Sequence, residues 1–206
     1  MPKEAWRESL RPRIEAARRQ LAARDAAEVA RRAGLTVRNG RLDLPLLDSS
    51  YRIAWPELSI TFRDGTDCPE ELVILVLDYL VRADGSAPSG EWIGFQELPD
   101  GAFYRRAFQG YSGDRLVREL AADADRFRRA ARALGGEPLP MGDTGFAFRV
   151  LPHVPLAVVW WDGNDEFPAN ATVLFDRVAG VYLPTDGLAI LGRMLCRALV
   201  QAAGSR

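Results

Sequence analysis

The stretch LTVRNGRLDL, residues 35–44, predicts a β-hairpin. Apolar and polar side chains alternate on both sides of Asn39-Gly40, and an Asn-Gly pair favours the two-residue type I′ turn between antiparallel strands. Residues 51–62, YRIAWPELSITF, predict a second pair of short strands. The turn between them falls at Pro56, because proline has no N–H to donate within a sheet. The fold is therefore expected to contain antiparallel strands.

Helices are predicted on both sides of these strands. Residues 3–33 predict a helical segment that is interrupted at Pro12 and carries only a narrow apolar stripe. Residues 68–85, CPEELVILVLDYLVRADG, predict a helix rather than a strand, because the apolar run is long and its polar residues share one stripe. The remaining faces of that helix must be buried.

The second half of the chain mixes both element types. Residues 114–134 predict one amphipathic helix, which Gly135 closes. The other elements are predicted as a strand within 90–98, a short helix at 100–108, two strands with a proline-bounded kink at 146–161, and a core helix at 184–203.

Strands that cluster in hairpins and helices that stand apart from them indicate an α+β fold. We expect a mainly antiparallel sheet packed against long core helices, with an N-terminal helical arm. The arm is assigned to residues 1–34 and a single α+β domain to residues 35–206, which is an ordinary domain length.

The N-terminal segment is basic in a chain of net charge −1. Residues 1–41 carry eleven Lys and Arg against five Asp and Glu. A basic arm can bind nucleic acid, but such helix faces are more often solvated or docked on acidic surface, so nucleic acid is not the expected partner. The first residues lack the apolar core of a secretory signal, and no apolar run reaches the roughly 18 residues that span a bilayer. We expect a cytoplasmic protein without a membrane partner.

The sequence lacks the residues that several common catalytic and metal-binding sites need. His153 is the single histidine, Cys68 and Cys196 are the only cysteines, and Lys3 is the only lysine. His- or Cys-based metal sites, a Walker A loop and a Schiff-base lysine are therefore excluded or poorly supported within this chain. His153 lies close to prolines on both sides, which predicts a structural hydrogen-bonding role.

Carboxylates are the chemical groups that remain. Asp162, Asp165 and Glu166 follow a predicted strand and are weak candidates for a Mg²⁺ or Ca²⁺ site, although Phe167 stands where a calcium loop needs glycine. The alternative is that these acids form caps or turns, and that Asp176 and the adjacent arginine make a surface pair.

Aromatic side chains accompany these acids. Trp160 and Trp161 are adjacent on a predicted strand, so they must point to opposite faces of the sheet. Trp92 is one of several aromatics that fit either a ligand pocket beside the carboxylates or ordinary core.

Segments in both halves, GEWIGFQELPDG at 90–101 and DEFPANATVLFD at 165–176, resemble an uncharacterised prokaryotic domain-of-unknown-function family. The resemblance covers roughly residues 50–200 and implies no catalytic residue. Some members of the family are joined to a four-iron–four-sulfur domain of the corrinoid-protein type. This chain lacks the cysteines for such a module, so the resemblance implies at most an iron–sulfur or corrinoid-type partner protein. The candidate binding residues that match the motifs are Glu91, Trp92, Glu97, Asp165 and Glu166.

Two functions fit these observations. The first is a ligand-binding or protein-interaction domain without catalysis, accessory to a redox or metallo-cofactor system. The alternative is an enzyme that uses Glu91, Glu97, Asp165 and Glu166 as acid, base or divalent-metal ligands. The cofactor, the oligomeric state and the presence of any reaction are open at this level.

Overall fold

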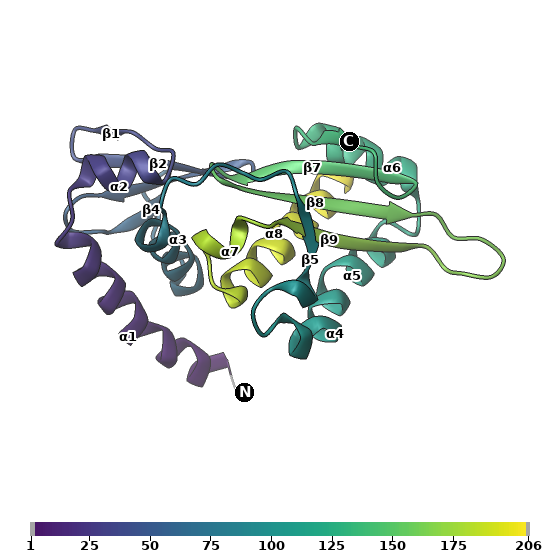
Figure 1. The fold of residues 1–206 in the computed structure, drawn as a ribbon, viewed down its shortest axis with the longest axis horizontal. Helices are drawn as coiled ribbons and strands as arrows, with labels where there is room; N and C mark the ends of the chain where they lie inside the picture. Colours follow the sequence, from purple (N-terminus) through teal and green to yellow (C-terminus); the bar gives the residue numbers. More distant parts are fainter. Residues whose placement is uncertain (1–2, 205–206) are drawn as a thin grey trace. The chain divides into compact units, whose positions relative to one another are not determined.

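The structure is a computed structural model that describes residues 3–204, with side chains from Leu10 onward. Its residues divide into two compact units. The N-terminal unit contains the chain up to Ala87 together with Leu151–His153 and Val181–Pro184, and the C-terminal unit contains the remainder. Each unit has its own antiparallel sheet, so the predicted α+β class is confirmed (Figure 1). The arm boundary at residue 34 stays a prediction.

The N-terminal sheet has the strand order β1-β2-β3-β4. The predicted hairpin is confirmed: Arg38 pairs with Arg41, and Asn39 and Gly40 have φ of 49° and 68°, as the type I′ turn requires. The second predicted pair is confirmed too, with the turn at the cis Trp55–Pro56 peptide. The strands are β1 Val37–Arg38, β2 Arg41–Leu46, β3 Ser49–Ala54 and β4 Ile60–Phe62.

The helices of this unit are α1 Lys3–Ala22, α2 Ala26–Arg32 and α3 Glu70–Arg82. The predicted interruption at Pro12 is wrong, because α1 continues through it. Proline removes one helical hydrogen bond, but its fixed φ is itself helical. The break falls instead before α2, where Asp25 caps the new helix by accepting a hydrogen bond from the Glu28 N–H at 2.8 Å.

Helix α3 is the buried centre of the N-terminal unit, and α1 packs against it. Ion pairs fasten α1 to α3: Arg11 Nε lies 3.1 Å from Glu70, and Arg13 lies 3.0 Å from Asp78. Arg24 donates to the Val81 carbonyl at 2.8 Å. Part of the basic charge of the N-terminal segment is therefore matched within its own unit.

The single histidine lies in a stack of rings in this unit. His153 stacks on Tyr182 at 5.4 Å, and Tyr182 stacks on Tyr79 at 5.5 Å. The buried Tyr79 hydroxyl donates to the Ala33 carbonyl at 2.8 Å. These contacts fit the structural role predicted for His153.

The C-terminal sheet has the order β5-β9-β8-β7-β6. The strand predicted within 90–98 is shorter than expected, because a 3₁₀ turn, η1 Phe95–Glu97, follows β5 directly. The two strands predicted at 146–161 are confirmed as β7 and β8. The strands are β5 Trp92–Gly94, β6 Glu137–Leu139, β7 Thr144–Leu151, β8 Val154–Trp161 and β9 Asn170–Asp176.

The single helix predicted at 114–134 is wrong, because α5 and α6 are separate helices. Ala121 and Ala122 both have φ of 55°, and Asp123 then caps α6 through the N–H groups of Asp125 and Arg126. A good cap residue thus interrupts an apolar period that would suit one continuous helix. The helices are α4 Gly101–Tyr111, α5 Gly113–Glu119, α6 Ala124–Ala133, α7 Ala179–Tyr182 and α8 Thr185–Gly204.

Helix α8 packs against α5 and α6 and supplies much of the core, as predicted. It is also long and apolar enough to cross a membrane by length and composition alone, a property that core helices share. Trp160 is fully buried while Trp161 is 39% exposed, so the prediction of opposite faces is confirmed.

Candidate functional site

The antiparallel pairing of β5 with β9 brings the two quoted motifs together. Trp92 lies opposite Asp176 in this register. Asp176 is buried, and its carboxylate accepts hydrogen bonds from the Ser89 N–H and hydroxyl (3.0 and 2.8 Å), the Gly90 N–H (2.7 Å) and the Val178 N–H (2.9 Å). Burial alone would raise the pKa of Asp176, but these hydrogen bonds bring it below its ordinary value. The predicted surface pair is therefore wrong, and Asp176 is an internal clasp.

Glu91 and Glu97 lie near this clasp at the surface. The Arg177 guanidinium donates to both oxygens of Glu91, at 2.6 and 2.7 Å, and these hydrogen bonds lower the pKa of Glu91. Glu97 accepts a hydrogen bond from the Gly94 N–H at 2.8 Å and so closes the 3₁₀ turn. A carboxylate held by a guanidinium has a weakened affinity for protons, so Glu91 is poorly suited to act as a general base.

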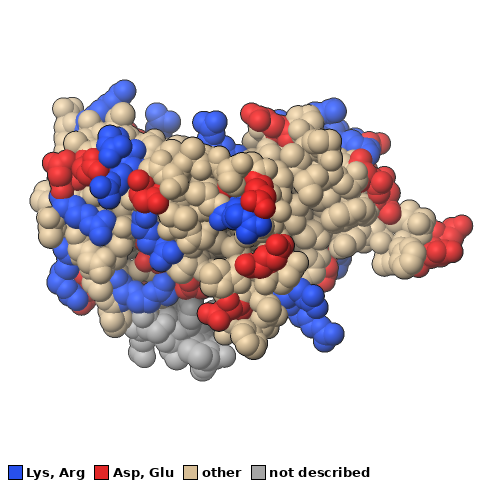
Figure 2. All heavy atoms as spheres, in the orientation of Figure 1, with Lys and Arg blue, Asp and Glu red and all other residues tan. Residues whose placement is uncertain are grey.

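The β8–β9 connection, residues 162–169, extends beyond the ends of its strands (Figure 1). Acidic atoms gather at its tip (Figure 2). Asp162 accepts a hydrogen bond from the indole N–H of Trp160 at 3.0 Å. Asp165 and Glu166 are exposed, and the Asn164 side chain accepts from the N–H groups of Glu166 (2.9 Å) and Phe167 (2.7 Å). The tip of the loop is thus organised by Asn164 rather than by Asp165 and Glu166.

The predicted site residues therefore form two groups. Glu91, Trp92 and Glu97 lie near the C-terminal end of β9, whereas Asp165 and Glu166 precede its N-terminal end. Seven residues of strand at about 3.3 Å each separate the two ends by roughly 20 Å. Among residues 3–204 no group of three or more His, Cys, Asp or Glu side chains is arranged to hold a metal, and Asp162, Asp165 and Glu166 do not form one.

Two variants distinguish the contribution of the Asn164 turn to stability from that of the adjacent acids. Asn164→Ala removes the acceptor for two N–H groups, so we expect a loss of about 1 kcal/mol in the free energy of unfolding. The double change Asp165→Asn/Glu166→Gln alters only exposed groups and is expected to stay within about 0.5 kcal/mol. Urea denaturation measures both. A larger loss in the double variant than in Asn164→Ala would contradict this account of the loop.

The motif GEWIGFQELPDG leads directly into helix α4 and fixes its start. The ring of Phe95 stacks on Phe108 of α4, with centroids 4.1 Å apart and planes 12° from parallel. Asp100 precedes the helix with φ of 58°. A Cβ on Gly101 would lie 1.9 Å from the Phe95 carbonyl oxygen, so the chain at this corner has room only for glycine.

The other end of α4 is fixed against β9. A Cβ on Gly113 would lie 1.9 Å from the Ala171 carbonyl oxygen. The Gln109 side chain donates to that same oxygen at 2.9 Å and to Asp114 at 2.7 Å. Helix α4 is thus fixed at both ends, and the motif residues determine its position.

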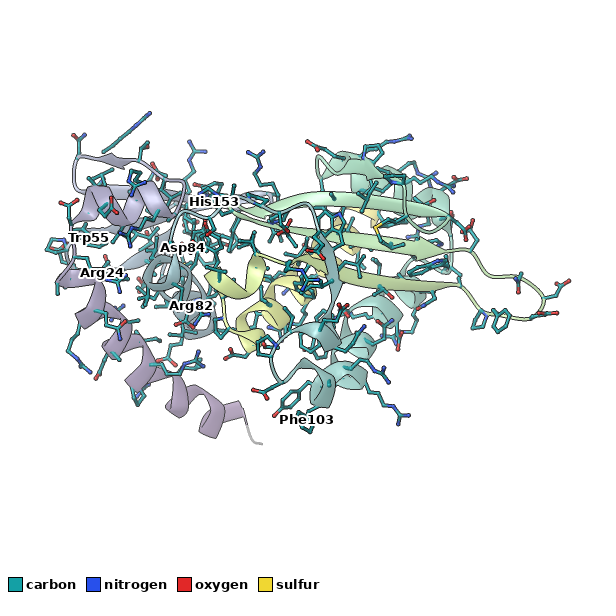
Figure 3. The ribbon with its side chains drawn as sticks, in the orientation of Figure 1. Arg24, Trp55, Arg82, Asp84, Phe103 and His153 are labelled. Atoms are coloured by element: carbon teal, nitrogen blue, oxygen red, sulfur yellow. The ribbon has the colours of Figure 1, made fainter. Side chains whose placement is uncertain are left out.

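The first turns of α4 are uncovered among the described residues, because every residue from Ala102 to Ala107 is exposed. Phe103 is 86% exposed and Tyr104 is 64% exposed. Phe103 points away from the fold (Figure 3). Arg105 and Arg106 are exposed as well, and no described carboxylate pairs with either. We call these four residues the α4 surface.

The α4 surface was missed in the sequence, where residues 100–108 predicted only a short helix. The available signal was the run FYRR, two aromatics followed by two arginines without an acid in the helix. The run alone does not show which of these side chains would be exposed, because that depends on how the distant strand β9 packs.

The fold and the site together define a class: an α+β protein with two antiparallel sheets and an exposed helix that carries aromatic and basic side chains. The chain matches the family model described as Domain of unknown function (DUF3786) over residues 25–198. It therefore belongs to this family, and the expectation of an uncharacterised domain-of-unknown-function family is confirmed. No curated protein and no solved structure matches the chain.

Proposed function

We propose that this chain is a protein-interaction domain without a catalytic role, and that its α4 surface binds the acidic surface of a partner protein. The observation that carries the proposal is the 86% exposure of Phe103 on a helix fixed at both ends. Burying a Phe side chain is worth about 1.5–3 kcal/mol. Aromatic and Arg side chains are also the residues that dominate the energetics of protein interfaces.

The charge of the α4 surface indicates the chemistry of the partner. Arg105 and Arg106 lie within one turn, and α4 itself contains no acidic residue. Because no described carboxylate neutralises them, these arginines complement an acidic surface. In the complex, carboxylates of the partner would accept hydrogen bonds from the guanidinium groups, and the partner would bury the ring of Phe103.

Gly110 adds a second indication. It lies inside α4, and a Cβ at this position would meet no atom within 4 Å. Glycine lowers the stability of a helix by up to about 1 kcal/mol relative to alanine, and no described residue lies close enough to require it here. Close approach of a partner backbone to α4 would account for a residue without a side chain.

The family resemblance suggests the partner class as part of the same proposal. An iron–sulfur or corrinoid-type protein in the cytoplasm would make this chain an accessory to a redox or metallo-cofactor system. The enzyme alternative has less support, because Glu91 is paired with Arg177 and lies far from Asp165. Neither cysteine is a ready nucleophile, since burial raises the pKa of Cys68 to about 11 and that of Cys196 to about 12.

The proposal is tested by placing a photo-crosslinking phenylalanine analogue at position 103 in cells that express the chain. Position 129, an exposed arginine on α6, carries the same analogue as the matched control. We expect one partner protein with an acidic surface to be captured from position 103 and not from position 129. Capture of a second copy of the chain, or equal capture from both positions, would contradict the proposal.

Binding to the purified partner is then measured by calorimetry. We expect Phe103→Ser and Arg106→Glu each to weaken binding at least about ten-fold, which corresponds to 1.4 kcal/mol, and Arg129→Glu to leave it unchanged. Binding should also weaken as salt is added, because the charges of the interface are screened. Wild-type affinity in both α4 variants would show that another surface binds the partner.

A further inference from the structure

A cavity of about 350 Å³ lies in the N-terminal unit, apart from the α4 surface. This volume falls in the range of small-molecule sites, roughly 300–1,000 Å³. Helix α1 provides one wall, and the segments around β4 and the start of α3 provide the others. The charged and titratable residues of its lining are Arg11, Glu15, Arg18, Asp67, Cys68 and Glu70.

Arg18 is the unusual residue of this cavity. Its Nε is buried, and it is the one buried side-chain nitrogen or oxygen without a hydrogen-bond partner in the described part of the chain. Buried polar groups are almost always hydrogen-bonded, and an unpaired donor on a charged group is costly. No described carboxylate forms an ion pair with Arg18, so the described residues leave this donor unmatched.

Other arginines of α1 do have carboxylate partners within the N-terminal unit. Arg11 is paired with Glu70 at 3.1 Å and Arg13 with Asp78 at 3.0 Å. A larger groove of about 500 Å³ in the same unit is lined by Arg24 and Arg82 (Figure 3), and both donate to backbone carbonyls. Arg18 thus differs from these four arginines because its buried Nε–H has no hydrogen-bond partner among the described residues.

The surroundings select the kind of anion. A guanidinium matches the planar geometry of a carboxylate or the oxygens of a phosphate. Glu15, Asp67 and Glu70 also line the cavity, and Glu70 already pairs with Arg11. These carboxylates would repel a doubly charged phosphate more than a singly charged carboxylate. Burial and the charges of Asp67 and Asp64 raise the pKa of the Cys68 thiol to about 11, so Cys68 adds no charge at neutral pH.

We propose that this cavity binds a small organic carboxylate, whose oxygens accept hydrogen bonds from the Arg18 guanidinium. The ligand satisfies the Nε–H that the described residues leave unpaired, once Arg18 moves enough to expose this buried atom to the cavity. The site is independent of the α4 surface, so each can fail without the other.

The test follows the arginine Nε–H groups of the ¹⁵N-labelled protein by NMR while acetate, lactate or inorganic phosphate is added at constant ionic strength. Concentrations up to about 10 mM suffice for a site of millimolar affinity. We expect acetate or lactate to shift the Arg18 signal, which Arg18→Gln identifies by its disappearance, and phosphate to have a much weaker effect. A response to phosphate alone would overturn the carboxylate class, and no response to any probe would overturn the site.

Three variants supply the second readout, the rise in melting temperature that a ligand bound to the folded state produces. Arg18→Gln should abolish the carboxylate-dependent rise, whereas Arg41→Gln, at an exposed position of β2 outside the cavity lining, should retain it. Asp67→Asn removes a repelling charge and should tighten binding by about five-fold. An equal rise in wild type and Arg18→Gln, or weaker binding in Asp67→Asn, would overturn the proposal.

Discussion

Gly101→Ala is expected to lower the free energy of unfolding by about 3 kcal/mol or more. The added Cβ would lie 1.9 Å from the Phe95 carbonyl oxygen and 3.4 Å from the Leu98 side chain. Because the Phe95 carbonyl oxygen is a backbone atom, a side-chain rotamer change cannot remove this clash. The clash can be relieved only if η1 or the start of α4 moves. Either movement disturbs the stack of Phe95 on Phe108, whose ring centroids are 4.1 Å apart. For a chain of this length the melting temperature should fall by about 10 °C.

The matched control lies on the same helix. Gly110→Ala adds the same methyl group where no atom lies within 4 Å, so it should leave stability unchanged or raise it by up to about 1 kcal/mol. If a partner backbone approaches α4 closely, Gly110→Ala should also weaken partner binding while the fold is unharmed. Equal stability of Gly101→Ala and wild type would show that the corner before α4 is not tightly packed.

Asp176→Asn is the second change with a large expected effect, a loss of about 3 kcal/mol. The carboxylate accepts hydrogen bonds from four donors, three of them on Oδ1 and one, the Gly90 N–H, on Oδ2. An asparagine amide replaces one accepting oxygen by an NH₂ group, which then faces a donor. Asp176 is fully buried, so solvent cannot reach the mismatched groups, and the junction between β5 and β9 should loosen.

The pH dependence gives an independent check. The pKa of Asp176 in the folded state is lowered below its ordinary value of about 3.9 by its hydrogen bonds, against the opposing effect of burial. A lowered folded-state pKa contributes stability that is fully present above the unfolded pKa and is lost as pH falls through the folded pKa. The stability difference between wild type and Asp176→Asn should therefore shrink as the pH falls below about 4.

Glu91→Gln serves as the control for this prediction. It removes an exposed ion pair with Arg177 a few residues from the clasp, and exposed pairs contribute at most about 1 kcal/mol. Urea denaturation across pH 3–7 compares the three proteins. A loss in Glu91→Gln as large as that in Asp176→Asn would mean that the surface pair, and not the clasp, joins the two strands.

Local patterns account for the elements that were predicted well. The Asn39-Gly40 turn, the apolar run of α3 and the alternation around Trp160 all depend on residues within one turn or one strand. The predictions that were wrong failed because a second local preference outweighed the one on which the prediction was based. At Asp123 a capping side chain overrode the period that favours one long helix, and at Pro12 a helical φ outweighed the lost hydrogen bond.

The candidate site was only partly within reach of the sequence. The composition narrows the chemistry, since one histidine, one lysine and two separated cysteines leave few catalytic groups. The motif residues were identified, but their roles were not. Glu91 is paired with a residue 86 positions away, and Glu97 holds a turn. Neither role can be inferred from neighbours along the chain.

Turn types, helix periods and the excluded chemistries follow from the amino acids alone, because they depend on backbone conformation within a few residues or on which groups exist at all. The Asp176 clasp, the exposure of Phe103 and the unpaired Nε of Arg18 depend on the packing of segments distant in the chain. Burial and hydrogen-bond partners depend on which residues lie side by side in three dimensions. Those neighbours are determined by the register of β5 against β9 and by the packing of α1 on α3.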